Sequence, residues 1–356
     1  MKNKKNILES NVLYTLIAIV IGFVIGAIFL AAAGINPGAA YGKLINGIFG
    51  KPKFMVWTLV YAAPLIFTGL SVAFSFRTGV FNIGAEGQFV VGSLAACFVG
   101  IVCKLPPVLH AIVCILAAAI AGFVWSYLVG LLKVKRGIHE VLSFIMFNWL
   151  AFYLSNYCVN TELLHKEGDG EATKNVLDSA RILFPKGIQK MLDCSSANWG
   201  FVIAVLAAVA IWIIIEKTTL GYRLKAVGFN KDAATYGGIN ANKSILTALG
   251  ISGALAGIGV AVQLLGMSAR ISQFAGQEGF GFQGITVALI AGSNPLGCIF
   301  AGIFYGAMKY GGAKLTMVGA PEEVIDLIMG CVIIFIAISQ VFKTLFQKMA
   351  KRKETK

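Results

Sequence analysis

The amino-acid sequence predicts an all-α polytopic membrane protein with about ten transmembrane helices. Of its 356 residues, 58% are hydrophobic and only 13% are charged, whereas a soluble domain carries about 25% charged residues. Apolar runs of spanning length follow one another along most of the chain, and basic residues cluster between them. These observations exclude a soluble globular protein and predict a single membrane domain over residues 1–356.

The candidate membrane crossings are apolar runs of about 20 residues. In chain order they cover residues 12–34, 54–76, 81–103, 108–132, 138–158, 199–216, 244–266, 280–293, 295–313 and 322–342. The run at 280–293 is short for a full crossing, so we expect a broken or re-entrant helix there. The first run is longer than the apolar core of a signal peptide, so we expect it to remain as a first span.

Basic residues between the runs predict the side of the membrane on which each connector lies. With the N-terminus inside, the clusters KVKR at 133–136 and KRKETK at 351–356 both fall in the cytoplasm. Lys51 and Lys53 fall outside and weaken this bias. We therefore expect both termini in the cytoplasm. The net charge of +14 follows from these flanking residues, and without a nucleic-acid-binding motif we expect no nucleic-acid partner.

The longest hydrophilic connector predicted on the outer side covers residues 159–198. It mixes acidic and basic residues and carries no recognisable motif, so we interpret it as a solvated extracellular loop. Cys158 and Cys194 bracket this loop and are the two cysteines placed to pair. The other cysteines lie mostly in apolar runs, where a thiol behaves as a small buried side chain.

Small residues recur at four-residue spacing within several apolar runs, as Gly22 with Gly26, Gly253 with Gly257, and Gly302 with Gly306. Pairs of this kind allow two helices to approach closely. We therefore expect helix–helix contacts at these positions.

The stretch TGVFNIGAEGQFVVGSLA at 78–95 places Asn82, Glu86 and Gln88 inside an apolar run. A carboxylate at membrane depth is costly and usually faces the protein interior or a water-filled cavity. On a helix, Asn82 and Glu86 would share one face. We interpret the three side chains as lining a substrate pathway. The alternative is that Glu86 lies at a helix N-terminus or pairs with Arg77.

Asn148 is a further polar residue within an apolar run, VLSFIMFNWLAFYL. Because a side-chain amide both donates and accepts hydrogen bonds, Asn148 is suited to contact a polar solute, and we predict the same pathway role for it. The alternative is a hydrogen bond to a neighbouring helix.

Residues 217–243 are far more polar than a connector between two spans requires. Their core, AVGFNKDAATYGGI, predicts a short helix over 232–236 between two glycine turns, with Asn230 as its N-cap. Such a helix would form a rigid projection to which a cytoplasmic partner could bind. The alternative is an ordinary basic loop that binds anionic lipid head groups. The following GGINANKS lacks the second glycine of a phosphate-binding loop, so we do not expect the chain to bind ATP.

Three segments together carry a resemblance to a known family: FNIGAEGQFVVGSLAA, AVGFNKDAATYGGI and GFGFQGITVALIAGSNPLG. In this order, between about Pro64 and Lys314, they resemble bacterial ABC-transporter permeases of the branched-chain amino acid, simple-sugar and nucleoside importers. The first segment is most similar to the nucleoside and simple-sugar members. In this family an acidic residue often stands where this chain has Gln283.

The resemblance implies that the glycine-bracketed helix is the coupling helix, which enters a groove of an ATP-binding subunit. On this basis we assign ATPase coupling to Gly228, Asn230, Ala233, Ala234 and Gly238.

The resemblance also implies a function: a permease subunit of an ATP-driven importer in the bacterial cell membrane, with a nucleoside or simple sugar as solute. The implied partners are a cytoplasmic ATP-binding subunit, a second permease subunit (identical or paralogous), an extracellular solute-binding lipoprotein and the lipid bilayer. We expect no enzymatic activity, cofactor or metal in the chain itself, with ATP hydrolysis on the separate subunit. The alternative is an ATPase-independent secondary transporter or channel for a small polar solute, which would show similar intramembrane glycines and a similar broken helix.

Overall fold

The computed structural model of the chain describes residues 11–166, 168, 170–321, 323–336 and 338. These residues form helices and loops, and apart from isolated bridges they contain no strand, in agreement with the predicted all-α class. The chain divides into two compact units, residues 1–54 with 308–356 and residues 55–307. The topology prediction depends partly on the two terminal tails. These tails, residues 1–10 and 339–356, lie outside the described residues.

The first unit is built from α2 (Asn11–Ala32), α3 (Pro37–Phe49), η3 (Leu315–Val318) and the helical residues 323–336. Gly22 and Gly26 of α2 lie so close to Val332 and Ile328 that a Cβ atom on either glycine would overlap those side chains. This confirms the close helix packing that the glycine spacing predicts.

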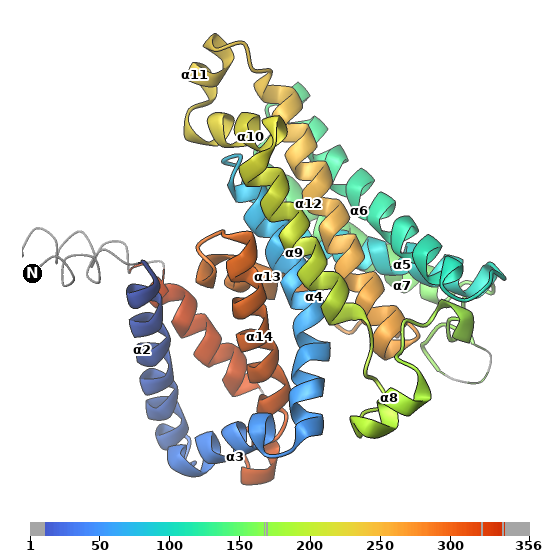
Figure 1. Cartoon of the computed structure of the whole chain (residues 1–356), viewed down its shortest axis with the longest axis vertical. Helices are drawn as coiled ribbons and strands as arrows, with labels where there is room; N and C mark the ends of the chain where they lie inside the picture. Colours follow the sequence, from blue (N-terminus) through green and yellow to red (C-terminus); the bar gives the residue numbers. More distant parts are fainter. Residues whose placement is uncertain (1–10, 167, 169, 322, 337, 339–356) are drawn as a thin grey trace, which may run out of the picture. The chain divides into compact units, whose positions relative to one another are not determined.

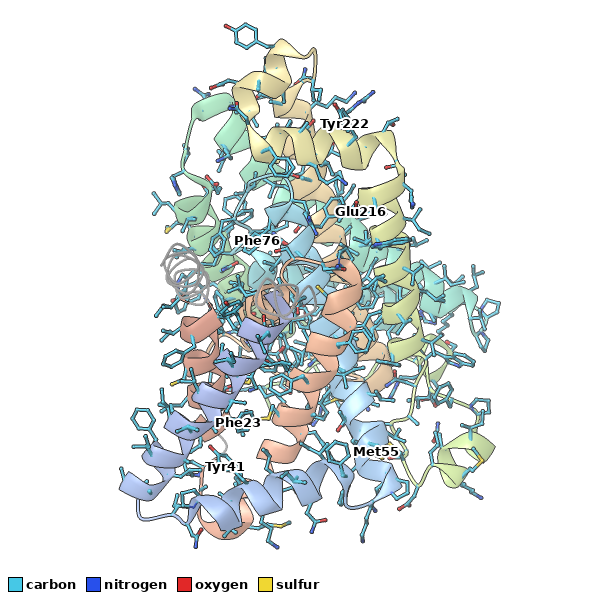
Figure 2. All side chains as sticks on the ribbon, turned by 60° about the vertical axis from the view of Figure 1, so that its left-hand side comes forward. Phe23, Tyr41, Met55, Phe76, Glu216 and Tyr222 are labelled. Carbon is cyan, nitrogen blue, oxygen red and sulfur yellow. The ribbon has the colours of Figure 1, made fainter. Side chains whose placement is uncertain are left out.

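α3 lies in a stretch for which the sequence predicts no helix. The Asn36 side chain accepts a hydrogen bond from the Gly38 N–H at 2.9 Å, and Pro37 occupies the first helical position, a combination that favours a helix start. The Tyr41 hydroxyl donates to the Phe23 carbonyl at 2.5 Å, and the two rings pack edge to face (Figure 2). These contacts hold α3 against α2.

The second unit contains the helices from α4 to α14 in Figure 1. They are α4 (Pro52–Phe76), α5 (Ala85–Val102), α6 (Leu109–Arg136), α7 (Glu140–Val159), η1 (Asp178–Ala180), α8 (Lys186–Met191), α9 (Gly200–Lys217), α10 (Thr219–Phe229), α11 (Lys231–Tyr236), α12 (Ala241–Gln263), η2 (Leu264–Ser268), α13 (Phe280–Ile290) and α14 (Pro295–Gly312), with α4 and α14 running on into the first unit. Gly253 and Gly257 of α12 pack directly on the backbone of Gly122 and Ala118 in α6, as their spacing predicts. The glycine pair of α14 meets α4 in the same way.

Seven of the described helices are long and apolar enough to cross a membrane. They are Leu13–Ala32, Pro52–Phe76, Ala85–Val102, Leu109–Arg136, Glu140–Val159, Gly200–Lys217 and Ala241–Ser268, and each coincides with a predicted run. The other predicted runs contain α13, α14 and residues 323–336. A helical membrane protein is therefore supported, while the total of about ten crossings stays a prediction.

The chain between α12 and α14 is not a continuous helix, as the short apolar run predicts. α12 passes through η2, which is π-helical, into a non-helical segment at 269–279. The 11 residues of α13 follow and extend only about 16 Å, roughly half the thickness of a bilayer core. After α13, the Ser293 carbonyl accepts a hydrogen bond from Arg77 Nε at 3.1 Å. The segment 269–279 and α13 together replace one full-length helix.

Nearly all described charged side chains of the connector at 159–198 are exposed, as the sequence predicts, but other parts of the connector pack against the protein. Several of its side chains are buried, Thr173 completely. The Thr173 N–H donates to the Ile271 carbonyl at 2.9 Å, and its hydroxyl accepts from the Ile271 N–H at 3.1 Å. Apolar residues between the charged ones allow this burial, and the connector packs against the non-helical segment after η2. No disulfide joins Cys158 to Cys194.

Candidate functional site

Asn82 and Gln88 form the centre of a buried polar network in the second unit. Their side-chain amides exchange two hydrogen bonds of 3.0 Å, and both side chains are completely buried. Asn82 also donates to Ser252 Oγ of α12 at 2.7 Å, and the Ser252 hydroxyl donates to the Ser71 carbonyl of α4 at 2.6 Å. The network joins α4, α5 and α12 at one point. The sequence predicts the two amides but not the serines, because a serine within an apolar helix gives no distinctive signal.

The prediction that Asn82 and Glu86 share a helix face is wrong, because α5 begins only at Ala85. Asn82 lies in the preceding turn, where its side chain accepts a hydrogen bond from the Gly84 N–H at 2.9 Å. Such a local side-chain bond competes with helix formation. The side chains of Asn82 and Glu86 consequently bond to different elements, Asn82 to α12 and Glu86 to the start of α13.

The Glu86 carboxylate, in a residue only 1% exposed, accepts two hydrogen bonds at the start of α13. The Gly279 N–H lies 2.8 Å from one oxygen, and the Gly281 N–H lies 2.7 Å from the other. A carboxylate is favourable at a helix N-terminus, since the first N–H groups lack partners within the helix. Gly281 is required here, because a Cβ atom would lie 2.1 Å from the Glu86 nitrogen. Glu86 therefore joins α5 to α13, while Arg77 bonds a carbonyl elsewhere.

Asn148 of α7 holds the beginning of α5. Its Oδ1 accepts from the Gly87 N–H at 2.9 Å, and its Nδ2 donates to the Ile83 carbonyl at 3.1 Å. This is the hydrogen bond to a neighbouring element that we considered as the alternative. All of the predicted pathway residues are thus buried and bonded to protein atoms, and their part in solute passage stays a prediction.

The short helix predicted in the polar connector is present as α11, at one end of the second unit (Figure 1). The Asn230 side chain caps it by accepting from the Ala233 N–H at 2.9 Å, as predicted. Gly238 follows the helix with φ +80°, a conformation that glycine adopts without strain. Ala233 is exposed. α11 is therefore a well-capped projection that presents at least one of the predicted coupling residues to its surroundings.

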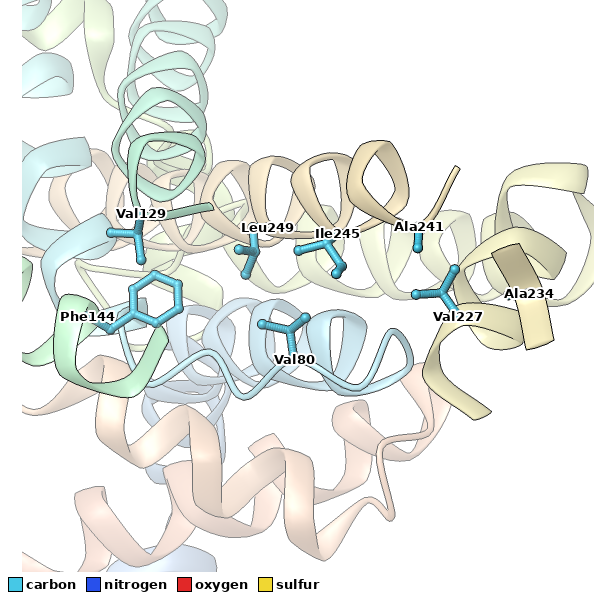
Figure 3. Close-up of a cluster of buried hydrophobic side chains, with 8 residues drawn as sticks. All are labelled: Val80, Val129, Phe144, Val227, Ala234, Ala241, Ile245 and Leu249. Carbon is cyan, nitrogen blue, oxygen red and sulfur yellow. The ribbon is translucent and has the colours of Figure 1, made fainter. Parts of the chain in front are cut away.

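Ala234, by contrast, is buried in an apolar cluster of the second unit (Figure 3). The cluster consists of Val80, Val129, Phe144, Val227, Ala234, Ala241, Ile245 and Leu249. Phe144 supports the turn before α5, since a Cβ atom on Gly84 would lie 2.0 Å from its ring. Gly228 packs closely on the chain after α4, where a Cβ atom would lie 2.2 Å from the Arg77 carbonyl oxygen. Packing contacts therefore connect α11 to the neighbourhood of the polar network.

Two aromatic side chains that the sequence prediction missed lie at the ends of α11: Phe229 shortly before its first residue, and Tyr236 as its last residue. Phe229 is 90% exposed and Tyr236 is 95% exposed. Large aromatic side chains are frequent anchors of protein interfaces. The signal that could have found them is an aromatic residue at each end of a polar, glycine-bracketed helix.

The family model described as branched-chain amino acid transport system / permease component matches residues 54–337. The chain belongs to this permease family. In the family, permeases are integral membrane transport components and ATP hydrolysis takes place on a separate subunit. The chain is accordingly a transporter subunit and not an enzyme.

Individual relatives match over nearly the full length. The guanosine ABC transporter permease protein NupP of Bacillus subtilis (strain 168) is 37% identical, over 96% of this chain and 98% of its own. The nucleoside ABC transporter permease protein NupB of Lactococcus lactis subsp. cremoris is 33% identical, over 95% and 93%. The glucose ABC transporter permease protein TsgB13 of Haloferax volcanii is 29% identical, over 90% and 85%. No solved structure shows a significant match.

Proposed function

We propose that this chain is the permease subunit of an ABC importer that carries nucleosides across the bacterial cell membrane. The observation that carries the proposal is the similarity, along almost the whole chain, to permeases named for guanosine and for nucleosides. A simple sugar is the second candidate solute, because a glucose permease is 29% identical over 90% of the chain. Identity is higher, and coverage longer, for the two nucleoside permeases.

The chain forms one membrane domain with about ten crossings, and both termini and α11 lie in the cytoplasm. The last turn of α6 carries Lys133, Lys135 and Arg136, and α6 and α11 share the apolar cluster at the same end of the second unit. Basic residues favour the cytoplasmic side, which supports this orientation. α12 runs from that end for about 35 Å, so the segment 269–279 lies on the external side.

The partners of the subunit are an ATP-binding subunit in the cytoplasm, a second permease subunit (identical or paralogous) and an external solute-binding lipoprotein. α11 contacts the ATP-binding subunit through the exposed Ala233 and the flanking Phe229 and Tyr236. Asn230 and Gly238 support this contact by holding the shape of α11. The roles of Gly228 and Ala234 are to attach α11 to the membrane domain.

Movement of α11 reaches the solute pathway through the apolar cluster. Ala234 and Phe144 belong to the same packed cluster, and Phe144 supports the turn that leads into α5. A displacement of α11 would therefore shift this turn and open the polar network next to it. Packed side chains can transmit such a change when they have two discrete arrangements. In the open arrangement, Asn82, Glu86, Gln88 and Asn148 would face the solute.

The solute assignment is tested by uptake into proteoliposomes that contain the purified permease complex and enclosed ATP. Labelled guanosine is supplied together with the solute-binding protein, and unlabelled uridine, ribose or glucose is added as competitor. We expect uridine to reduce guanosine uptake and glucose to have no effect. Uptake of labelled glucose without uptake of guanosine would contradict the nucleoside assignment and establish the second candidate.

A further inference from the structure

A polar cavity of about 310 Å³ lies at the end of α12 that is remote from α11. Its polar walls include Ser93, Gln263, Ser268, Arg270, Gln273 and Glu278. Small-molecule sites in proteins range from about 300 to 1,000 Å³, so the cavity is large enough for a small solute. None of the four predicted pathway residues, Asn82, Glu86, Gln88 and Asn148, lines this cavity.

The wall of the cavity is made largely by irregular backbone. It includes the π-helical η2 and the non-helical segment 269–279, whose first residue, Ala269, has φ +59°. π-helical turns and strained residues are frequent at functional sites. At membrane depth, irregular backbone persists only where it is buried in protein or lines a cavity, and interrupted helices commonly form the solute sites of transporters. A continuous helix would avoid this strain, which makes the interruption a candidate for a functional role.

Several contacts hold this wall in place. The Asn156 side chain of α7 accepts from the Phe274 N–H at 2.9 Å and donates to the Phe274 carbonyl at 3.0 Å. The Gln273 N–H donates to the Glu171 carbonyl of the outer connector at 2.7 Å. Glu86 binds the other end of the segment through Gly279. Because the wall is fixed from three elements, a solute would meet a preorganised site.

The chemistry of the walls indicates a neutral solute with hydroxyl and N–H groups. Gln263 Oε1 is buried and accepts no hydrogen bond from any described residue, and a buried acceptor of this kind is costly to leave unbonded. Arg270 and Glu278 line the same cavity as one basic and one acidic residue, so the lining does not single out an anionic or a cationic solute. Phe274 adds an aromatic ring, against which a planar base can stack.

We propose that this cavity is a solute-binding site of the permease and that its ligand is a neutral nucleoside. Gln263 and Ser268 bond the hydroxyls and base edge, and Phe274 packs against the base. The inference rests on the proposed function and names the place where the imported nucleoside binds within the membrane domain. In the arrangement that the structure describes, Glu86 is a positioning residue for this site, since it holds the Gly279 turn next to Glu278.

The test measures binding of tritiated guanosine to the purified permease complex in lipid nanodiscs. Gln263→Leu removes the amide while keeping a similar volume. Gln277→Leu is the matched control, because Gln277 lies in the wall segment 269–279 but does not line the cavity. We expect the Kd for guanosine to rise about five- to tenfold in Gln263→Leu, as for the loss of one or two hydrogen bonds. Gln277→Leu should leave it unchanged.

Size-exclusion chromatography and the ATP hydrolysis rate of the complex check that each variant is folded. Gln263→Asn, which keeps the amide on a shorter side chain, provides a second variant and should raise the Kd by less than Gln263→Leu. If the wild type imports guanosine but Gln263→Leu keeps the wild-type Kd and KM, the cavity is not the site and the proposed function stands. If the wild type binds and imports glucose but no nucleoside, the ligand class and the proposed function are both overturned.

Discussion

Replacing Glu86 by glutamine tests whether the hydrogen bonds of its carboxylate attach α13 to α5. The carboxylate accepts from the N–H groups of Gly279 and Gly281 at 2.8 and 2.7 Å in a residue only 1% exposed. A glutamine offers one oxygen and one NH₂ group, so one of these N–H groups would face another donor. A hydrogen bond to a charged group contributes about 1.5–3 kcal/mol, and an unbonded buried donor costs about 1–3 kcal/mol. Because removing a buried charge offsets part of this loss, we expect Glu86→Gln to lower the free energy of unfolding by about 2–3 kcal/mol.

The assay combines the apparent Tm of the purified protein in nanodiscs with the rate of guanosine uptake. We expect both to fall in Glu86→Gln, since α13 and the turn at Gly279 lose their attachment to α5. Glu162→Gln, at an exposed carboxylate of the connector at 159–198, is the control and should change neither. A wild-type Tm together with wild-type uptake in Glu86→Gln would refute the role of this carboxylate in joining the two helices.

The other predictions concern close packing and coupling. Gly281→Ala would place a Cβ atom 2.1 Å from the Glu86 nitrogen and should abolish the yield of monodisperse protein, whereas Gly187→Ala, with no atom within 4 Å of the added Cβ, should purify normally. Ala233→Arg, on the exposed surface of α11, should change the free energy of unfolding by no more than about 0.5 kcal/mol. It should nevertheless reduce ATP-driven uptake at least about tenfold. Normal uptake by this variant would show that Ala233 does not contact the ATP-binding subunit. Ala234→Asp places a charge in the apolar cluster and should lower the Tm itself, so a variant with unchanged Tm would contradict the packing described.

The features that depend on local sequence could be predicted from the chain alone. Hydropathy located the long apolar helices, because lipid requires an uninterrupted apolar segment. Glycines and Asn230 located α11, because a short helix needs a cap and turns at its ends. The short run near 280 likewise indicated an interrupted helix, since its length is insufficient for a bilayer.

The features that depend on distant contacts could not be predicted in this way. Glu86 is conspicuous in the sequence, but its partners lie 193 and 195 residues further along the chain. Ser71 and Ser252 are 181 residues apart and meet only in the fold. The charges of residues 159–198 predict a solvated connector, but they do not indicate that Thr173 is buried by pairing with Ile271. No local pattern indicates such pairings.

The measurement that tests the central claim most directly is guanosine accumulation by proteoliposomes with and without the ATP-binding subunit. The permease is reconstituted alone, with the active ATP-binding subunit, or with a variant of that subunit that binds but does not hydrolyse ATP. We predict accumulation only with the active subunit and enclosed ATP. Accumulation by the permease alone, driven by an imposed ion gradient, would contradict a membrane pathway that is operated through α11 by a separate ATPase.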